Sequence, residues 1–139
     1  MTTARHLEII DLLRARDFPP ECGPSDVGSQ GPGFHIAELN GHFGDGASAD
    51  ADREAEAEQR LAEQEGLLRG LTERWGEPDT FSLAGTRLRV ERDEEVPEPW
   101  RRLGQQMGWL HLWRVDQRWI GVGLSAFQLL AVVTETDPP

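Results

Sequence analysis

The segment from Gly108 to Gly123, GWLHLWRVDQRWIGVG, constrains the fold of this 139-residue chain more than any other. Two apolar stretches, 109–115 and 119–124, flank the turn-like residues VDQR, which is typical of two strands joined by a tight turn. Alternate residues of a strand point to opposite faces of the sheet. If the turn brings Arg114 opposite Trp119, one face of this ribbon gathers six mostly large side chains. These are Trp109, His111, Trp113, Ile120, Val122 and Leu124.

The opposite face of the ribbon places two leucines over two glycines. These are Leu110, Leu112, Gly121 and Gly123. Glycines in a strand leave a shallow trough that a helix can approach closely. Both faces of the ribbon therefore need cover. We expect a helix over residues 51–75 to cover one of them, helped by a helix over residues 3–17.

Hydrophobic periodicity predicts these two helices and one more. Leucines and isoleucines recur at helical spacing in residues 3–17, and leucines trace one face of residues 51–75. Gly76 can supply the left-handed residue that ends the second helix. A short third helix is predicted to start near Pro99. Its apolar side would consist of Trp100, Leu103 and Met107.

Two further segments favour strands. Residues 128–134, QLLAVVT, form a continuous apolar run, which indicates a strand covered on both faces. Between residues 80 and 91 the large apolar side chains change from odd to even positions. Because a regular strand cannot put both sets on one face, we predict a hairpin or a bulged strand that turns at Ala84-Gly85.

Residues 19–50 are rich in Gly, Pro, Ser and Asp. They predict an irregular, poorly packed loop, or a small hairpin that turns at Asn40-Gly41. The chain as a whole, residues 1–139, is predicted to be a single domain of the α+β class. We expect two main helices packed on an antiparallel sheet of four or five strands, formed mostly by the C-terminal half, residues 80–135.

The charge of the chain narrows the choice of partner. The net charge is −11 at pH 7, and all 14 basic residues are arginine. Nucleic acids and anionic membranes are bound through clustered cations, so neither is expected as a partner. An acidic surface would instead speed encounter with a basic protein. Because the sequence has no lysine and no tyrosine, Schiff-base lysines, P-loop lysines and tyrosine general acids are excluded.

The cysteine content and the N-terminus favour a cytoplasmic location. Cys22 is the only cysteine, so the chain can form neither an intramolecular disulfide nor a thiol-based metal cage of its own. The apolar run near the N-terminus is interrupted by charged residues, unlike a signal peptide. No stretch reaches the roughly 20 apolar residues that a membrane span needs.

No set of residues points to catalysis. The serines and Cys22 lie outside any known nucleophile motif, and the glycines after Ile120 open no phosphate-binding helix. Three residues with ligand-like spacing, His35, His42 and Asp45, are the candidates for a metal site. They would support a metal-assisted hydrolase as a third alternative. No cofactor is expected.

The tryptophans can fill a core or form a binding face. Each ring buries about 150–250 Å², so several exposed rings on one sheet would make a large apolar patch. One interpretation places most rings in the core. The other places at least two on a face that binds a partner, with acidic residues of helix 51–65 and of a segment after residue 90 steering that partner. The candidate residues are Trp100, Trp109, His111, Trp113, Trp119, Glu91, Asp93, Glu94 and Glu95.

The sequence therefore predicts a small acidic protein-binding module without catalytic activity, of the immunity, adaptor or chaperone type. Its partner would be another protein, in particular a basic one, or a second copy bound through the sheet. A different class of function, binding of a small ligand, is the main alternative. The pocket would lie between helix and sheet and would be lined by Trp75, Trp109, His111 and Trp113.

Overall fold

The computed structural model describes residues 3–39, 50–125 and 128–138, with the backbone alone for residues 50–57. Within these ranges the helices are α1 (Thr3–Ala15), α2 (Asp50–Trp75), α3 (Ala84–Glu91) and α4 (Trp100–Gln106). The strands are β1 (Gly23–Pro24), β2 (Gly28–Gly31), β3 (Phe34–Glu38), β4 (Asp79–Ser82), β5 (Trp109–Val115), β6 (Arg118–Leu124) and β7 (Leu129–Thr134).

The strands form one sheet in the order β1-β2-β3-β7-β6-β5-β4. Every pair of neighbours is antiparallel. The α+β class is confirmed. The sheet has seven strands in the described residues instead of the expected four or five, because β1, β2 and β3 of the N-terminal third join the four from the C-terminal half.

The predicted register of the ribbon is confirmed. Arg114 lies opposite Trp119, and Trp113 lies opposite Ile120. Asp116 and Gln117 form a two-residue turn in which both φ angles are positive, 51° and 69°. A turn of this kind matches the right-handed twist of the two strands that it joins. Trp109 and Trp113 therefore share one face of β5.

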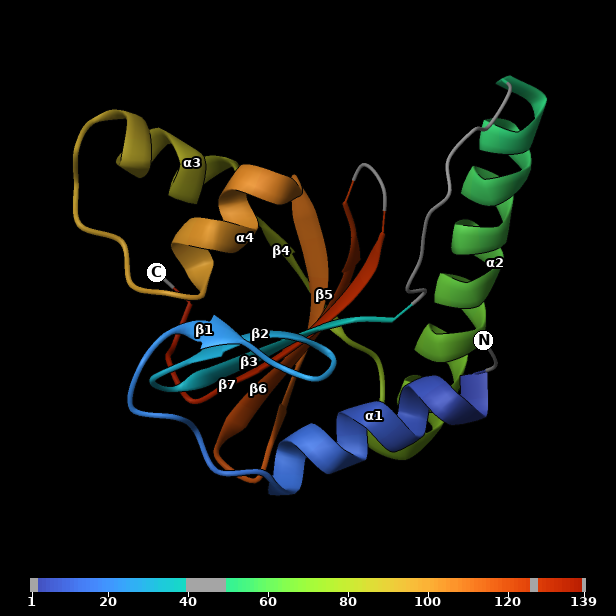
Figure 1. Ribbon diagram of the computed structural model, residues 1–139, viewed down its shortest axis with the longest axis horizontal. Helices are drawn as coiled ribbons and strands as arrows, with labels where there is room; N and C mark the ends of the chain where they lie inside the picture. The colour runs from blue at the N-terminus through green and yellow to red at the C-terminus, as the bar shows by residue number, and fades with distance from the viewer. Residues whose placement is uncertain (1–2, 40–49, 126–127, 139) are drawn as a thin grey trace.

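Helices cover both faces of the sheet, so that the sheet lies between two helical layers (Figure 1). On one face α1 and α2 bury Leu13, Leu67 and Trp113 in the first core cluster. On the other face α4 buries Trp100 and Leu103 in the second. The prediction that helix 51–75 covers one face of the ribbon, with help from the N-terminal helix, is confirmed, and that face is the one with Trp113.

The glycine trough on the second face admits α4. A Cβ atom on Gly121 would lie 2.8 Å from a methyl group of Val132, and one on Gly123 would lie 2.8 Å from the Met107 sulfur. Residues larger than glycine would therefore push apart β6, β7 and the end of α4. The predicted short helix from Pro99 is the element that uses this space, with Trp100, Leu103 and Met107 all buried.

The structure differs from the prediction for residues 80–91. β4 ends at Ser82, and the chain then forms α3 instead of a second strand or a bulge. The change of the apolar residues from odd to even positions thus marks a change from strand to helix. Leu88, which the hairpin would have paired, is half exposed on α3.

Residues 19–50 also differ from the predicted loop where the structure describes them. β3 lies beside β7 inside the sheet, and Phe34, Ile36 and Ala37 are buried. The small-hairpin alternative is closer, but β2 and β3 are joined at Pro32-Gly33. The expected turn at Asn40-Gly41 lies outside the described residues.

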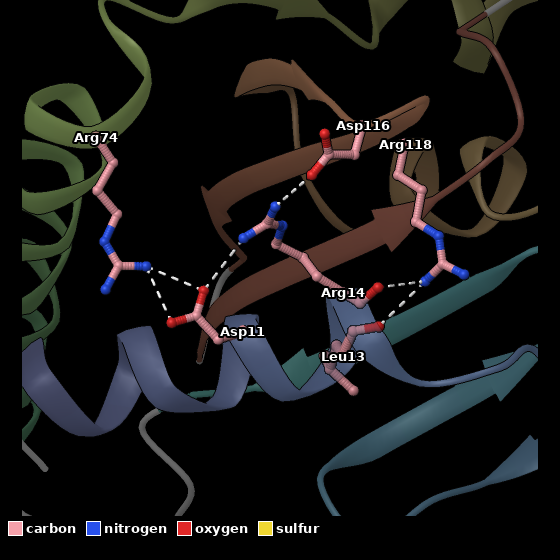
Figure 2. Close-up of polar contacts among 6 residues, drawn as sticks. All are labelled: Asp11, Leu13, Arg14, Arg74, Asp116 and Arg118. Carbon is pink, nitrogen blue, oxygen red and sulfur yellow. Dashed lines mark hydrogen bonds and ion pairs between the residues drawn. The ribbon is translucent and has the colours of Figure 1, made fainter.

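Arginine side chains fasten α1 to the rest of the fold. Arg118 of β6 donates from Nη1 to the main-chain oxygens of Leu13 and Arg14, at 3.3 and 2.9 Å, at the end of α1 (Figure 2). The Leu13 oxygen also accepts from the N–H of Arg16 at 3.3 Å, and because the last carbonyls of a helix lack the usual helical donors, the guanidinium acts as a C-terminal cap. Asp11 of α1 pairs with Arg74 of α2 at 3.0 Å, which ties the two helices together.

Candidate functional site

The five tryptophans differ in how much of their surface is exposed and in the contacts that their rings make. Trp100 and Trp113 are buried, with 0% and 4% of their surface exposed. The indole N–H of Trp100 donates to the main-chain oxygen of Thr136 at 3.0 Å, and that of Trp113 donates to the oxygen of Gly76 at 2.8 Å. Both rings are core residues with satisfied polar groups. Neither is accessible to a partner, contrary to their inclusion among the candidate binding residues.

Trp119 is partly buried on the opposite face of the sheet from Trp113. Its indole N–H donates to the carboxylate of Asp137 at 2.9 Å. Arg114 lies over its ring, 5.0 Å from the centroid, and also binds Asp137. The hydrogen bond from Trp119, followed by that from Arg114, lowers the pKa of the Asp137 carboxyl. The polar and cationic groups around this ring are therefore already engaged within the chain.

Trp75 also packs inside the fold. Its ring meets the ring of Trp113 edge to face, with centroids 6.1 Å apart, and the guanidinium of Arg14 lies 5.1 Å from its centroid. The predicted ligand pocket needed open space between Trp75 and Trp113. The two rings contact each other instead. A narrow apolar gap does lie in the other layer, between α4 and the sheet, but it is too small to hold a water molecule.

Trp109 is the tryptophan that remains available. It is 52% exposed. Its ring contact within the described residues is with His111, edge to face, with ring centroids 4.8 Å apart. No described residue accepts a hydrogen bond from its indole N–H. An exposed amphipathic ring of this size, with an N–H that no described residue binds, has what a partner-binding residue needs.

The neighbours of Trp109 come from the edge strand β4. Thr80 lies opposite His111, and Ser82 lies opposite Trp109. Both are exposed. Because opposite residues of neighbouring strands share a face, these four side chains form one continuous patch, which we call the Trp109 surface: Thr80, Ser82, Trp109 and His111. Burial lowers the pKa of His111, so its imidazole is uncharged at neutral pH.

The structure separates the two groups of acidic residues that were expected to steer a partner, those after residue 90 and those of residues 51–65. Glu91, Asp93, Glu94 and Glu95 are all exposed, as expected. Glu91 is the last residue of α3 and the other three follow it, and α3 lies in the layer that covers the other face of the sheet (Figure 1). Residues 51–65 belong to α2, which is on the same face as Trp109. In the sequence this stretch has six acidic residues and two arginines, a net charge of −4.

The candidate metal ligands are not brought together where the structure describes them. His35 is buried in β3, its ring stacks on Phe18 with centroids 5.1 Å apart, and its Nε2 is 3.2 Å from the oxygen of Asp17. Burial lowers its pKa. His42 and Asp45 lie outside the described residues. Within the described ranges no three His, Cys, Asp or Glu residues are grouped so as to hold a metal ion.

Comparisons of the chain with protein-family models, with curated proteins and with solved structures returned no match. Among the helices in the described part of the chain, none has both the length and the apolar character of a membrane span.

Sequence reasoning identified Trp109 and His111 but missed Thr80 and Ser82. Both belong to the segment that was expected to form a hairpin or bulge. The signal that could have found them is the short DTFS stretch between Pro78 and Leu83, since short strands next to proline are typical of sheet edges.

Proposed function

We propose that this protein is a non-catalytic protein-binding module, of the immunity, adaptor or chaperone type, and that it binds its partner through the Trp109 surface. The observation that carries the proposal is the exposure of Trp109, at 52%, with no described acceptor for its indole N–H. Trp100, Trp113 and Trp119 each donate a hydrogen bond within the chain.

Burial of Trp109 against a partner would stabilise a complex substantially. About half of a tryptophan side chain corresponds to roughly 100 Å² of surface, which is worth about 2.5 kcal/mol at 25 cal/mol per Å². A hydrogen bond to the free N–H would add to this. Contributions of this size are typical of the few anchor residues that dominate an interface.

The charge of the chain favours a basic partner. Two copies of a chain with net charge −11 repel each other at long range, whereas a basic protein is attracted. The exposed free thiol of Cys22 suits a reducing compartment. We therefore propose a basic protein of the cytoplasm, and not a second copy, as the partner.

Affinity capture from cells that contain the native protein, with matched variants, tests the proposal. The Trp109→Ala variant removes the proposed anchor. Leu12→Ala is its control, because Leu12 of α1 is exposed to a similar degree, 49%, but lies elsewhere. We expect a basic protein to be captured by the wild type and by Leu12→Ala and to be lost with Trp109→Ala, with capture weakening as salt rises.

Equal capture by all three chains would reject the Trp109 surface as the binding site. An acidic partner whose capture does not depend on salt would reject the charge argument.

A further inference from the structure

The geometry points to strand addition as the way in which this surface takes its partner: an extended basic segment pairs with the free edge of β4 and places a cationic side chain over Trp109. This inference rests on the proposed function and specifies its partner.

β4 is an edge strand. It is the last in the strand order, and within the described residues it pairs only with β5. Asp79, Thr80 and Ser82 are exposed, whereas Phe81 packs on the ring of Trp100 in α4, with centroids 5.6 Å apart. An exposed edge of this kind is the template on which extended peptides add a strand.

The hydrogen-bonding groups that point to the free edge belong to Thr80 and Ser82. The main-chain N–H of Leu83 donates to the oxygen of Gly108 at 2.8 Å, which continues the β4–β5 ladder by one residue. In an antiparallel pair every second residue bonds the same neighbour. Leu83 and Phe81 therefore bond β5, and the N–H and C=O groups of Thr80 and Ser82 point away from it.

The β5–β6 hairpin leads independently to the same assignment of which residues bond β5 and which face the free edge. Val115 and Arg118 flank the two-residue turn and pair with each other. The odd residues of β5 consequently bond β6, and the even residues bond β4. Leu110, opposite Phe81, is one of the even residues. The four outward groups of Thr80 and Ser82 are free within the described residues.

The free edge and Trp109 are close enough to act together. An added strand would lie about 4.8 Å from β4 and so about 9.6 Å from β5. The residues between them on this face are Thr80 and Ser82, whose side chains are short. A long side chain of the added strand can cross them and lie on the ring of Trp109, where an arginine or lysine gains a cation–π interaction.

The charges near β4 favour a basic segment. Three exposed carboxylates lie in or just before the strand, those of Glu73, Glu77 and Asp79. Arg74 among them is already paired with Asp11 at 3.0 Å. Beyond the other end of β4, the guanidinium of Arg87 donates to the oxygen of Gly104 at 2.9 Å. Both of these guanidinium groups are thus engaged within the chain, while the three carboxylates face solvent on a chain whose net charge is −11.

A second copy of the chain fits this edge poorly. Edge-to-edge pairing would bring together two chains that each have a net charge of −11 and so repel each other. Self-association through β4 is therefore opposed, and addition of a basic strand is not.

Selection of random linear peptides on the immobilised full-length chain tests the inference. We expect enrichment of peptides with Arg or Lys at alternating positions. The best peptide is then made in two forms, each N-methylated on one set of alternating residues. Only the set whose N–H groups face β4 matters for strand addition. Methylation of that set should weaken binding by about tenfold or more, and methylation of the other set should change it by less than about twofold.

Two variants of the protein give a second readout. Thr80→Pro removes an outward N–H that β5 does not use, and proline is tolerated at such edge positions. Thr80→Val changes the side chain but keeps the N–H group. We expect Thr80→Pro to lose about tenfold in affinity for the selected peptide and Thr80→Val, which alters only a side chain of the surface, to lose clearly less, with circular dichroism confirming that both are folded.

The outcomes separate this inference from the proposed function. Binding that depends on Trp109 but is insensitive to both methylation patterns and to Thr80→Pro overturns strand addition and leaves the Trp109 surface standing. Binding that is also unchanged in Trp109→Ala overturns both. If no peptide is enriched, strand addition is rejected, and the affinity capture above still decides the proposed function.

Discussion

Trp109 and Trp113 point to the same face of β5, yet 52% of Trp109 is exposed and only 4% of Trp113. The difference comes from what lies above them. The end of α2 brings Trp75 and Gly76 over Trp113, and no described helix covers Trp109 to the same extent. One strand face therefore supplies both a core residue and an accessible anchor.

The two rings should contribute very differently to stability. Trp113→Ala removes a buried ring and leaves the main-chain oxygen of Gly76 without its donor. We expect a loss of about 3–5 kcal/mol in the free energy of unfolding. Trp109→Ala should cost less than about 1 kcal/mol, because the ring is half in water. Urea unfolding followed by circular dichroism measures both. Similar losses in the two variants would contradict the assignment of Trp113 to the core and Trp109 to the surface.

Gly121 should not tolerate a larger side chain. The Cβ atom of Gly121→Ala would lie within 3 Å of side-chain atoms of Val132 and Leu110. We expect a loss of about 1–3 kcal/mol from overpacking. Gly85→Ala is the matched control, because its Cβ atom meets nothing within 4 Å and lies in α3. That change should be neutral or stabilise by up to about 1 kcal/mol. A stable Gly121→Ala protein would show that the side chains of Val132 and Leu110 do not pack closely over residue 121.

Removal of the guanidinium at residue 118 should loosen the end of α1. Arg118→Ala leaves the main-chain oxygens of Leu13, Arg14 and Arg16 without this donor. We expect a loss of about 1.5–3 kcal/mol and faster amide exchange in the last turn of α1. Arg114→Ala breaks an exposed ion pair with Asp137 and should cost less than about 1 kcal/mol. If the two variants lose equal stability, the capping role is wrong.

Stability should fall on mild acidification. Burial lowers the pKa of both His6 and His35 below the ordinary value of 6.5. Below that pH the unfolded chain takes up protons that the folded chain does not, so stability is full above pH 6.5 and is lost as the pH falls. Each histidine contributes a slope of at most about 1.4 kcal/mol per pH unit.

Thermal unfolding between pH 7.5 and 5.0 measures this effect. The pKa values of Asp26 and Asp137 are lowered from 3.8, so these two carboxyl groups do not titrate in this range. His35→Gln should flatten the pH dependence, since the amide can still donate to the oxygen of Asp17 and does not titrate. An unchanged slope in this variant would show that His35 is not a source of the effect.

The ribbon could be predicted from sequence because two local rules agree on it. A two-residue turn fixes which residues lie opposite each other, and the period of two then assigns every side chain to a face. β7 was predictable for a related reason, because its unbroken apolar run needs cover on both sides. These rules use only residues that are close in the sequence.

The other elements depend on partners far along the chain. β2, GSQG, has none of the residues that favour strands, and it exists because β3 pairs with β7. In α3 the apolar and arginine residues alternate as they would in a strand, but the chain forms a helix that packs on α4. The exposure of Trp109 is equally non-local, since only the position of α2 distinguishes it from Trp113.

The pairing of β3 with β7 has a consequence for synthesis on the ribosome. Phe34 lies opposite Thr134, so about 100 residues separate the two sides of one ladder. Closing so long a loop is slow, and chains with many distant pairings fold slowly as a class. At typical rates of about 5–20 residues per second, the first three strands wait several seconds for the last one to emerge. During that time Phe34 and Ile36 lack the strand on which they pair, so the nascent chain should depend on chaperones until β7 has left the ribosome.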